Sequence, residues 1–236
     1  MNKDDLISLA DKYGTDKWSS HYYAQHYETH LSVFKNKKIK LLEIGVGGYS
    51  DPDKGGESLR MWKEYFCEGS IYAIDIFDKS SLEEDRIKIF QGSQTDNAFL
   101  QKVAEGAGGF DVIIDDGSHV NNHIISSFKY LFQHLKEGGV YVVEDLQTSY
   151  WKNDGGDSFD LRNKKTAMNF FKSLIDSLNY EEIDNPYYIV DDFDRNIVAI
   201  HFYHNMVFIQ KGKNNEGSNI IKNHIRPTRH KKTAKL

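Results

Sequence analysis

Two pairs of neighbouring carboxylates, Asp115-Asp116 and Glu144-Asp145, each stand at the end of a short apolar run, and His119 follows the first pair closely. If the two apolar runs are adjacent parallel strands, both pairs lie at one edge of a sheet. Carboxylates this close repel one another unless a cation or protons neutralise them. Oxygen ligands suit Mg²⁺, Ca²⁺ or Mn²⁺, and a histidine can exchange a proton near neutral pH. The pattern predicts a divalent cation site with an adjacent base.

Such a site suits the methylation of a hydroxyl group. A sugar hydroxyl is a poor nucleophile because its proton is tightly held. A cation at that oxygen or its neighbour lowers the hydroxyl pKa, and a base removes the proton. Attack on a sulfonium methyl group then needs positioning rather than covalent help. A structural interpretation, in which Asp115 and Asp116 cap a strand and His119 occupies a turn, remains the alternative.

A glycine loop, Glu43-Ile44-Gly45-Val46-Gly47-Gly48, precedes these acidic pairs. Glycines allow the backbone to approach a ligand closely, although the spacing differs from the dinucleotide fingerprint. Asp75 ends the next apolar run, where its carboxylate could accept both hydroxyls of a ribose. Residues 91–96, among them Ser93 and Gln94, supply short polar groups for an adenine edge. Together with Asp115, these positions predict an adenosyl-cofactor site.

Short apolar runs alternate with amphipathic stretches from residue 39 onward, which is typical of an α/β fold with a mostly parallel sheet. We expect the functional groups at the carboxyl ends of its strands. The late strands are expected to add an antiparallel pair. Strands are predicted at 39–44, 70–76, 87–91, 110–115, 140–144, 183–190 and 197–210, and helices at 58–66, 96–104, 122–135 and 164–178.

The composition describes an ordinary globular protein of 236 residues with a net charge of −5, which gives no general attraction to nucleic acid. Cys67 is the only cysteine, so an intrachain disulfide and a cysteine metal site are excluded. Neither a signal peptide nor an apolar run long enough for a membrane span is present. We therefore expect a cytoplasmic enzyme without a membrane span. We divide the chain into a helical lead-in (1–35), a main domain (36–212) and a basic tail (213–236).

The motifs LLEIGVGGY, GGESLRMWKEYF, IYAIDIFDKS, IDDGSH and YVVEDLQTSYW resemble those of macrolide and anthracycline sugar O-methyltransferases. The N-terminal DKYGTDKWSSHYYAQHY is similar to the segment that closes over the cofactor in those enzymes. The similarity covers residues 11–151, with weaker likeness to about residue 210. The resemblance implies a Rossmann-like class I methyltransferase fold that uses S-adenosylmethionine and Mg²⁺ or another divalent cation such as Mn²⁺.

The resemblance also implies roles for single residues. The cation ligands would be Asp116, Glu144 and Asp145, and His119 would be the general base, with Asp116 beside it in the catalytic group. The cofactor contacts would include Glu43, Gly45, Gly47 and Asp75, with Thr15, Asp16 and His21 as candidates at its methionine end. The substrate-side candidates are Tyr49 and Tyr150.

The acceptor is left open among several classes. The Lys-, Asn- and Ile-rich composition differs from the Ala- and Arg-rich composition expected of high-GC antibiotic producers. It favours a nucleotide-linked or surface-polysaccharide sugar, for instance a heptose or deoxysugar, over a macrolide. The alternatives are a methyltransferase of the same fold that acts on a non-sugar diol, and a non-catalytic nucleotide-binding protein. Aromatic residues in the last strand (Phe202, Tyr203 and Phe208), expected to be exposed, are compatible with a homo-oligomer.

Overall fold

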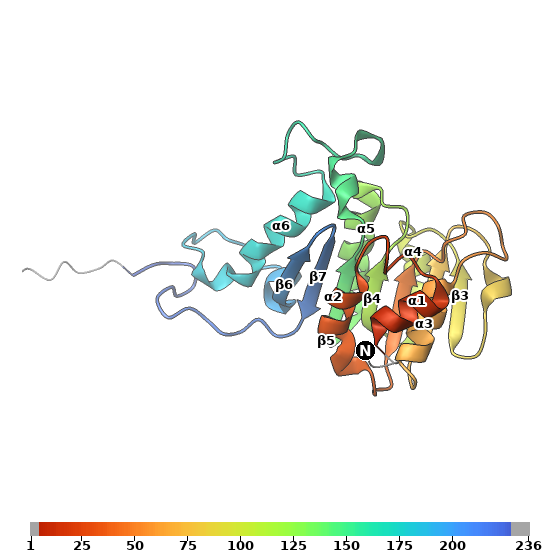
Figure 1. Ribbon diagram of the computed structural model, residues 1–236. Coiled ribbons are helices and arrows are strands. Elements are labelled where there is room, and N and C mark those ends of the chain that lie inside the picture. Colours follow the sequence, from red (N-terminus) through yellow and green to blue (C-terminus); the bar gives the residue numbers. More distant parts are fainter. Residues whose placement is uncertain (1–4, 228–236) are drawn as a thin grey trace, which may run out of the picture.

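The computed structural model describes residues 5–227, and one seven-stranded sheet forms its centre (Figure 1). The strands are β1 (Lys40–Ile44), β2 (Ser70–Asp75), β3 (Ile87–Gln91), β4 (Phe110–Asp115), β5 (Leu135–Val143), β6 (Ile197–Tyr203) and β7 (Met206–Lys211). Their order is β3-β2-β1-β4-β5-β7-β6. Strands β1 to β5 are parallel, and β7 is antiparallel to both of its neighbours. The expected α/β fold with an antiparallel C-terminal addition is confirmed.

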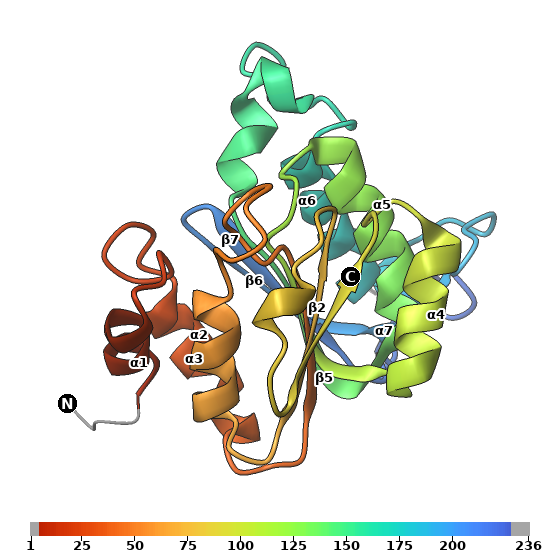
Figure 2. The same ribbon diagram turned by 90° about the vertical axis from the view of Figure 1, so that its right-hand side faces the viewer.

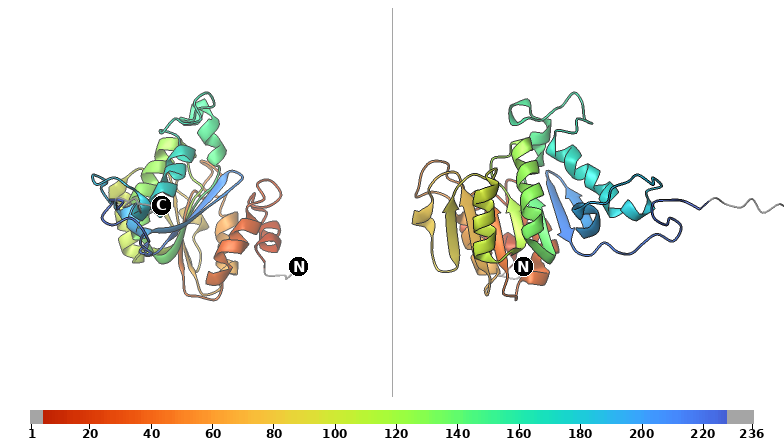
Figure 3. Two further views of the ribbon diagram at one scale, coloured as in Figure 1. Left: turned by 90° about the vertical axis from the view of Figure 1, so that its left-hand side faces the viewer. Right: turned by 180° about the vertical axis from the view of Figure 1, so that it is seen from behind.

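Helices cover both faces of the sheet. They are α1 (Leu6–Tyr13), α2 (Ala24–Leu31), α3 (Glu57–Tyr65), α4 (Asn97–Ala107), α5 (Asn121–Leu131), α6 (Ala167–Leu178) and α7 (Asp192–Asn196). Figure 2 shows α1, α2 and α3 on one face and α4, α5 and α6 on the other, and α4 and α5 lie side by side at the back (Figure 3). Within residues 5–227, no helix combines the length and apolar character that crossing a membrane requires.

Short 3₁₀ helices complete the connections. They are η1 (Ser32–Phe34), η2 (Ser80–Leu82), η3 (Phe132–His134), η4 (Leu146–Tyr150), η5 (Lys152–Asp154) and η6 (Tyr180–Glu182). The pair η4 and η5 follows β5 directly and lies above the carboxyl edge of the sheet. This edge therefore carries irregular structure, which places polar groups around a site without breaking the sheet.

The core consists of two hydrophobic clusters, one on each face of the sheet. Tyr27 of α2 and Trp62 of α3 belong to the first cluster, and Phe128 of α5 and Phe171 of α6 belong to the second. Leu6 of α1 is fully buried in the first cluster. The helical lead-in therefore packs into the same core as the sheet, and its backbone is held where it approaches the carboxyl edge.

The C-terminal strands differ from the expectation. Residues 183–190, predicted as a strand, form a turn in which Asn185 Oδ1 accepts a hydrogen bond from the Tyr187 N–H (3.0 Å). The proline that follows Asn185 cannot donate to a strand ladder, which favours this turn. The predicted strand 197–210 is a hairpin that reverses at Asn205, whose φ is +61°. The antiparallel addition thus comes from β6 and β7 alone.

Two further expectations need correction. The predicted helix 122–135 ends at Leu131, and β5 already begins at Leu135, so Gly138 and Gly139 lie within the strand and do not precede it. Phe208, expected as an exposed aromatic, is 1% exposed because β7 lies between β5 and β6 and faces α2.

The segment after β7 is packed against the domain over its described part. The Asn214 side chain donates to the Ser177 and Asp194 carbonyl oxygens (3.1 and 2.8 Å), and the Arg226 N–H donates to Asp184 Oδ1 (2.9 Å). Residues 213–227 are therefore anchored and do not form a free tail. The rest of the expected basic tail, residues 228–236, lies outside the described residues.

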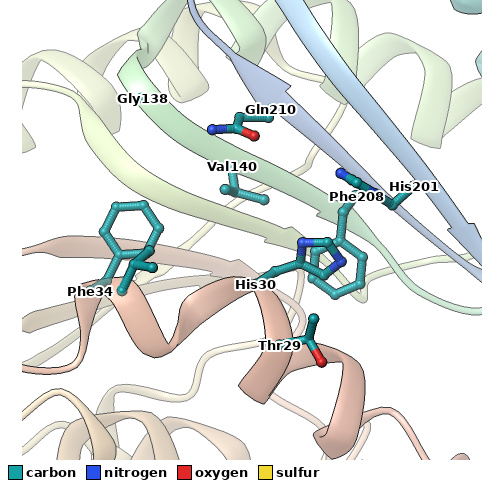
Figure 4. Close-up of a pocket in the computed structure, with 9 residues that line it drawn as sticks. Thr29, His30, Phe34, Gly138, Val140, His201, Phe208 and Gln210 are labelled. Atoms are coloured by element: carbon teal, nitrogen blue, oxygen red, sulfur yellow. The ribbon is translucent and has the colours of Figure 1, made fainter.

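A pocket of about 180 Å³ lies between α2 and the strands β5, β6 and β7 (Figure 4). Thr29 and His30 line it from the helix, and Val140, His201 and Phe208 line it from the sheet. It adjoins the beginning of β5, whereas the acidic residues follow the end of that strand. The pocket is thus separate from the predicted catalytic edge.

His30, which lines this pocket, makes the stability of the fold depend on pH. Burial, with smaller contributions from the nearby His201 and His26, lowers its pKa from the usual 6.5 to about 4. The folded state therefore resists a proton that the unfolded chain accepts, so stability falls as the pH drops from the unfolded pKa toward the folded one. From about pH 7.5 to about pH 5.5, we expect wild type to lose roughly 0.5–1 kcal/mol more unfolding free energy than His30→Asn.

Urea unfolding at both pH values measures this difference. His204→Asn is the matched control, because His204 is exposed in the β6–β7 turn and should behave as wild type. An identical pH dependence in wild type and His30→Asn would show that His30 titrates alike in the folded and unfolded chain.

Candidate active site

Acidic residues meet at the carboxyl edge of β1, β4 and β5. The register pairs Ile44 with Asp115 and Asp115 with Val143, so the three strands end at one level. The Asp116 N–H donates to the Ile44 carbonyl and the Glu144 N–H to the Asp115 carbonyl, each at 3.0 Å. The sheet thus fixes the backbone at the base of both acidic pairs. Asp116 lies with Glu144 and with Asp145, whereas the Asp115 side chain is bonded to Gln94 and Ser127.

The outer group consists of Asp116, His119 and Asp145, which are partly exposed and offer ligand atoms within 4.8 Å of one another. His119 Nε2 lies 3.7 Å from Asp145 Oδ2. His119 and Asp145 both have positive φ angles (55° and 54°), a conformation uncommon for residues other than glycine. The surrounding structure must hold this backbone, which is typical of functional sites.

Asp145 receives further contacts from the N-terminal segment. Tyr23 Oη donates to its Oδ1 at 2.8 Å, and His21 Nδ1 lies 3.0 Å from the same oxygen. Burial alone raises the pKa of Asp145, but the Tyr23 hydrogen bond and the neighbouring histidines outweigh it and leave that pKa below its usual value. Asp145 is therefore a carboxylate at neutral pH and is available to a cation.

The inner group consists of Glu43, Asp116 and Glu144, whose ligand atoms also lie within 4.8 Å of one another. Lys17 inserts among them and is only 1% exposed. Its Nζ lies 2.6 Å from Glu144 Oε1, 2.7 Å from Asp116 Oδ2 and 3.2 Å from Glu43 Oε1. Tyr27 Oη also donates to Glu144. A lysine that was not among the predicted residues thus occupies the centre of this group.

The charge of Lys17 is stabilised by these carboxylates. Burial alone lowers its pKa, but the charges of Asp116, Glu144 and Glu43 outweigh burial and hold that pKa well above its usual value. The ammonium cannot release its proton near neutral pH, so Lys17 is not a general base. Burial, together with the charge of Asp116, raises the pKa of Glu144 well above its usual value.

The three predicted cation ligands are divided between the two groups. Asp116 belongs to both, Asp145 to the outer group and Glu144 to the inner group. Glu144 is 3% exposed and contacts Lys17 and Tyr27. In this arrangement, Asp116 and Asp145 present the more accessible oxygens.

Glu43 lies elsewhere than expected for a cofactor contact. It is fully buried, and its Oε2 accepts hydrogen bonds from Ser58 Oγ (3.0 Å) and Trp62 Nε1 (3.1 Å). A side chain without exposed surface cannot touch a cofactor in this arrangement. Its charge faces Lys17 instead, so Glu43 belongs to the interior of the acidic site.

The glycine loop lies beside the acidic groups. A Cβ on Gly45 would come within 2.2 Å of the Asp116 carbonyl oxygen, so only glycine allows this loop to pack against the end of β4. Gly47 also has a positive φ, of 81°. Asp75 Oδ2 accepts from the Val46 N–H and its Oδ1 from the Phe77 N–H, each at 2.9 Å. Each oxygen keeps a second lone pair for a ligand.

Asp115 and Gln94 form an internal network. Gln94 Nε2 donates to Asp115 Oδ1 (3.1 Å), and Gln94 Oε1 accepts from the Ser118 N–H (2.9 Å). Burial raises the pKa of Asp115 to about 6. These two predicted cofactor residues thus support the 115–118 turn that leads to His119, whereas Ser93, whose hydroxyl pairs with Thr95, lies nearer the surface.

The remaining predicted residues differ in exposure. Thr15 is 8% exposed, and its hydroxyl accepts from the Lys17 N–H at 3.4 Å. His21 contacts Asp145, so it lies in the acidic site. The two substrate-side candidates are exposed, Tyr49 at 89% and Tyr150 at 40%. Their rings are free to contact an acceptor.

These features define a Rossmann-like methyltransferase fold with an acidic site at the strand ends. Mycinamicin VI 2''-O-methyltransferase of Micromonospora griseorubida is 45% identical over 221 residues, which cover 91% of this chain and 54% of that protein. An 8-demethyl-8-(2-methoxy-alpha-L-rhamnosyl)-tetracenomycin-C 3'-O-methyltransferase of Streptomyces olivaceus is 43% identical over 216 residues, which cover 91% of this chain and 55% of that protein. This chain is a homologue of these sugar O-methyltransferases, which confirms the resemblance found in its motifs.

A solved structure agrees with these relatives. The MycE methyltransferase from the mycinamycin biosynthetic pathway, in complex with Mg, SAH and mycinamycin VI, has a TM-score of 0.86 and 45% identity over 90% of this chain and 55% of that one. The chain thus spans about half the length of the relatives it matches. No family model matches the sequence.

Proposed function

We propose that this chain transfers the methyl group of S-adenosylmethionine to a hydroxyl of a sugar, with a divalent cation at the outer group. The observation that carries this proposal is the meeting of Asp116, His119 and Asp145 at the strand ends, beside the glycine loop. Homologues that are named sugar O-methyltransferases support the same reaction.

The outer group fits a magnesium ion by its chemistry. Asp116 and Asp145 offer carboxylate oxygens, the ligands that Mg²⁺ prefers, and both are partly exposed. When bound, Mg²⁺ or Mn²⁺ would lower the pKa of an acceptor hydroxyl and fix its direction. Glu144 would contribute through Asp116, with which it shares the Lys17 ammonium.

His119 would accept the proton of the acceptor hydroxyl. Its Nε2 lies 3.7 Å from Asp145 Oδ2, within the outer group where the acceptor hydroxyl would bind. The positive φ of His119 and the Gln94–Ser118 contact hold this side chain at the rim, where an acceptor can reach it. A general base must be held so that its nitrogen points toward the proton that it removes.

Asp75 would accept the ribose hydroxyls of the cofactor. We expect Asp75→Ala to weaken S-adenosylmethionine binding by about 10–100-fold, because hydrogen bonds to a charged group are lost. Isothermal titration calorimetry measures the affinity directly. Asp78→Ala, a change at an exposed acid in the same loop, is the control. An unchanged affinity for Asp75→Ala would remove this residue from the ribose site.

The acceptor is proposed to be a sugar carried on a larger molecule. The named relatives act on glycosylated macrolides and tetracenomycins, and the exposed rings of Tyr49 and Tyr150 could pack on a sugar face. The comparisons lend no support to the nucleotide-linked or surface-polysaccharide sugar that the composition favoured. Nucleotide-linked sugars are therefore included among the acceptors to be tested.

The test is methyl transfer to a panel of acceptors. Glycosylated macrolides, nucleotide-linked deoxysugars and catechols are incubated with S-adenosylmethionine and Mg²⁺, and products are read by mass. The proposal predicts methylation of a sugar, lost with EDTA and restored with Mg²⁺. Methylation of the catechol alone, activity that EDTA leaves intact, or cofactor binding without any S-adenosylhomocysteine would each contradict it.

A further inference from the structure

Lys17 is a fully enclosed cation whose partners are carboxylates from three different strand ends. Its ammonium is within 3.2 Å of oxygens of Glu43, Asp116 and Glu144. A buried charge is tolerated only when it is paired, and a buried group of three carboxylates needs positive charge in the same way. The ammonium and the carboxylates therefore depend on one another.

One oxygen of this group has no hydrogen-bond donor. Glu43 Oε1 is buried, and its contact with Lys17 Nζ, at 3.2 Å, is an ion pair and not a well-formed hydrogen bond. The opposite oxygen, Oε2, is satisfied by Ser58 and Trp62. Glu43 thus directs a buried oxygen at the ammonium, with which it forms an ion pair.

The backbone of Lys17 is fixed from outside the site. Its carbonyl oxygen accepts from the N–H groups of Tyr23 and Ala24, both at 2.9 Å. Tyr27, one turn further along α2, donates to Glu144 and is buried in the core. The lysine is therefore held in the inner group by the packing of the lead-in as well as by charge.

Asp116 connects Lys17 with the outer group. Its Oδ2 contacts the ammonium, and the same carboxylate belongs to the set formed with His119 and Asp145. In enzymes with two metal ions, a pair of cations a few ångströms apart is held within one acidic site. Here the Lys17 ammonium lies on one side of Asp116. The candidate ion site of the outer group lies on the other side.

We propose that Lys17 is a built-in cation that takes the place of a second divalent ion in the inner group. It balances part of the charge of Glu43, Asp116 and Glu144 and so leaves a site for a single divalent ion at the outer group. The inner-group claim stands on the contacts of Lys17, and only the count of one ion in wild type rests on the proposed function.

Replacing the ammonium by an apolar side chain tests this proposal. In Lys17→Met, the inner carboxylates lose their cation, and we expect the melting temperature in EDTA to fall by about 6–20 °C. Mn²⁺ should then enter the inner group. Electron paramagnetic resonance of free Mn²⁺ should show one more tightly bound ion per chain than in wild type, and Mn²⁺ should restore most of the lost melting temperature.

Lys79→Met is the matched control. Lys79 is also 1% exposed, but its ammonium donates to the backbone carbonyls of Asp51 and Lys54 (2.6 and 2.8 Å). Among residues 5–227 it forms no ion pair with a carboxylate. This variant should lose stability without gaining an ion, and Mn²⁺ should not restore it beyond its effect on wild type.

The outcomes separate this proposal from the proposed function. An equal number of bound ions in Lys17→Met and wild type, with no selective rescue by Mn²⁺, would overturn the role of Lys17. Wild type that binds no Mn²⁺, while Lys17→Met binds one, would support that role and contradict the outer metal site. If Lys17→Met folds only when purified in Mn²⁺, the proposal is supported. If neither Lys17→Met nor the double variant Lys17→Met/Glu43→Gln folds in Mn²⁺ or in EDTA, the packing of the lysine side chain, and not its charge, is what the fold requires. The proposal then fails.

Discussion

His119→Ala should lower the turnover number by about 10²–10⁴-fold, the usual contribution of a positioned base. The affinity for S-adenosylmethionine should stay within about twofold of wild type, because His119 is not among the predicted cofactor contacts, which include the glycine loop and Asp75. Single-turnover methyl transfer, together with calorimetric titration of the cofactor, measures the two quantities separately.

The control for this change is His204→Ala, at an exposed histidine in the turn between β6 and β7. Its turnover should match wild type. Equal losses of turnover and cofactor affinity in His119→Ala would instead assign a structural role to His119, namely support of the strained 115–119 turn.

Asp145→Asn should weaken Mg²⁺ binding by about 10–100-fold or more, since a charged ligand of the outer group becomes neutral. The Mg²⁺ concentration that gives half-maximal activity should rise by the same factor. The change keeps the shape of the side chain and leaves an acceptor for Tyr23, so the fold should be retained. A Mg²⁺ titration of activity, accompanied by the melting temperature, makes the measurement.

Asp160→Asn changes an exposed carboxylate in the loop after β5 and should leave the Mg²⁺ titration unaltered. If Asp145→Asn gave the same titration curve as this control, Asp145 would not be a ligand. In that case the acidic residues at the edge would serve the contacts of Tyr23 and His21 only.

The sheet and the acidic edge could be predicted from the sequence because their signals are local. A parallel strand buried on both faces is a continuous apolar run, and the runs ending at Ile44, Asp75 and Asp115 match β1, β2 and β4 closely. The polar residues that follow such runs must meet at one edge. This rule was enough to bring Asp116, His119 and Asp145 together.

Lys17 could not be predicted in the same way, because its partners are remote in the sequence. It lies 99 residues before Asp116 and 127 before Glu144. A lysine in a polar segment is usually solvated, and nothing local indicates that this one is buried. The available signal was the tyrosine-rich run from Tyr22 to Tyr27, in which Tyr23 and Tyr27 are buried and anchor the lead-in to the core.

The division of the carboxylates between the inner and outer groups could not be predicted from the sequence either. Glu144 and Asp145 are neighbours in the sequence, yet the positive φ of Asp145 turns the chain so that one side chain enters the interior and the other faces the rim. A backbone angle of this kind has no signature in an aspartate. The sequence therefore identified the acidic residues without assigning each to its group.

Crystals soaked in Mn²⁺ and measured near the manganese absorption edge locate the ion directly. The account predicts one anomalous peak within coordination distance of both Asp116 and Asp145, next to the His119 imidazole, with the Lys17 ammonium still among Glu43, Asp116 and Glu144. An ion that displaces Lys17 from those three carboxylates, or a rim without any peak, would contradict it.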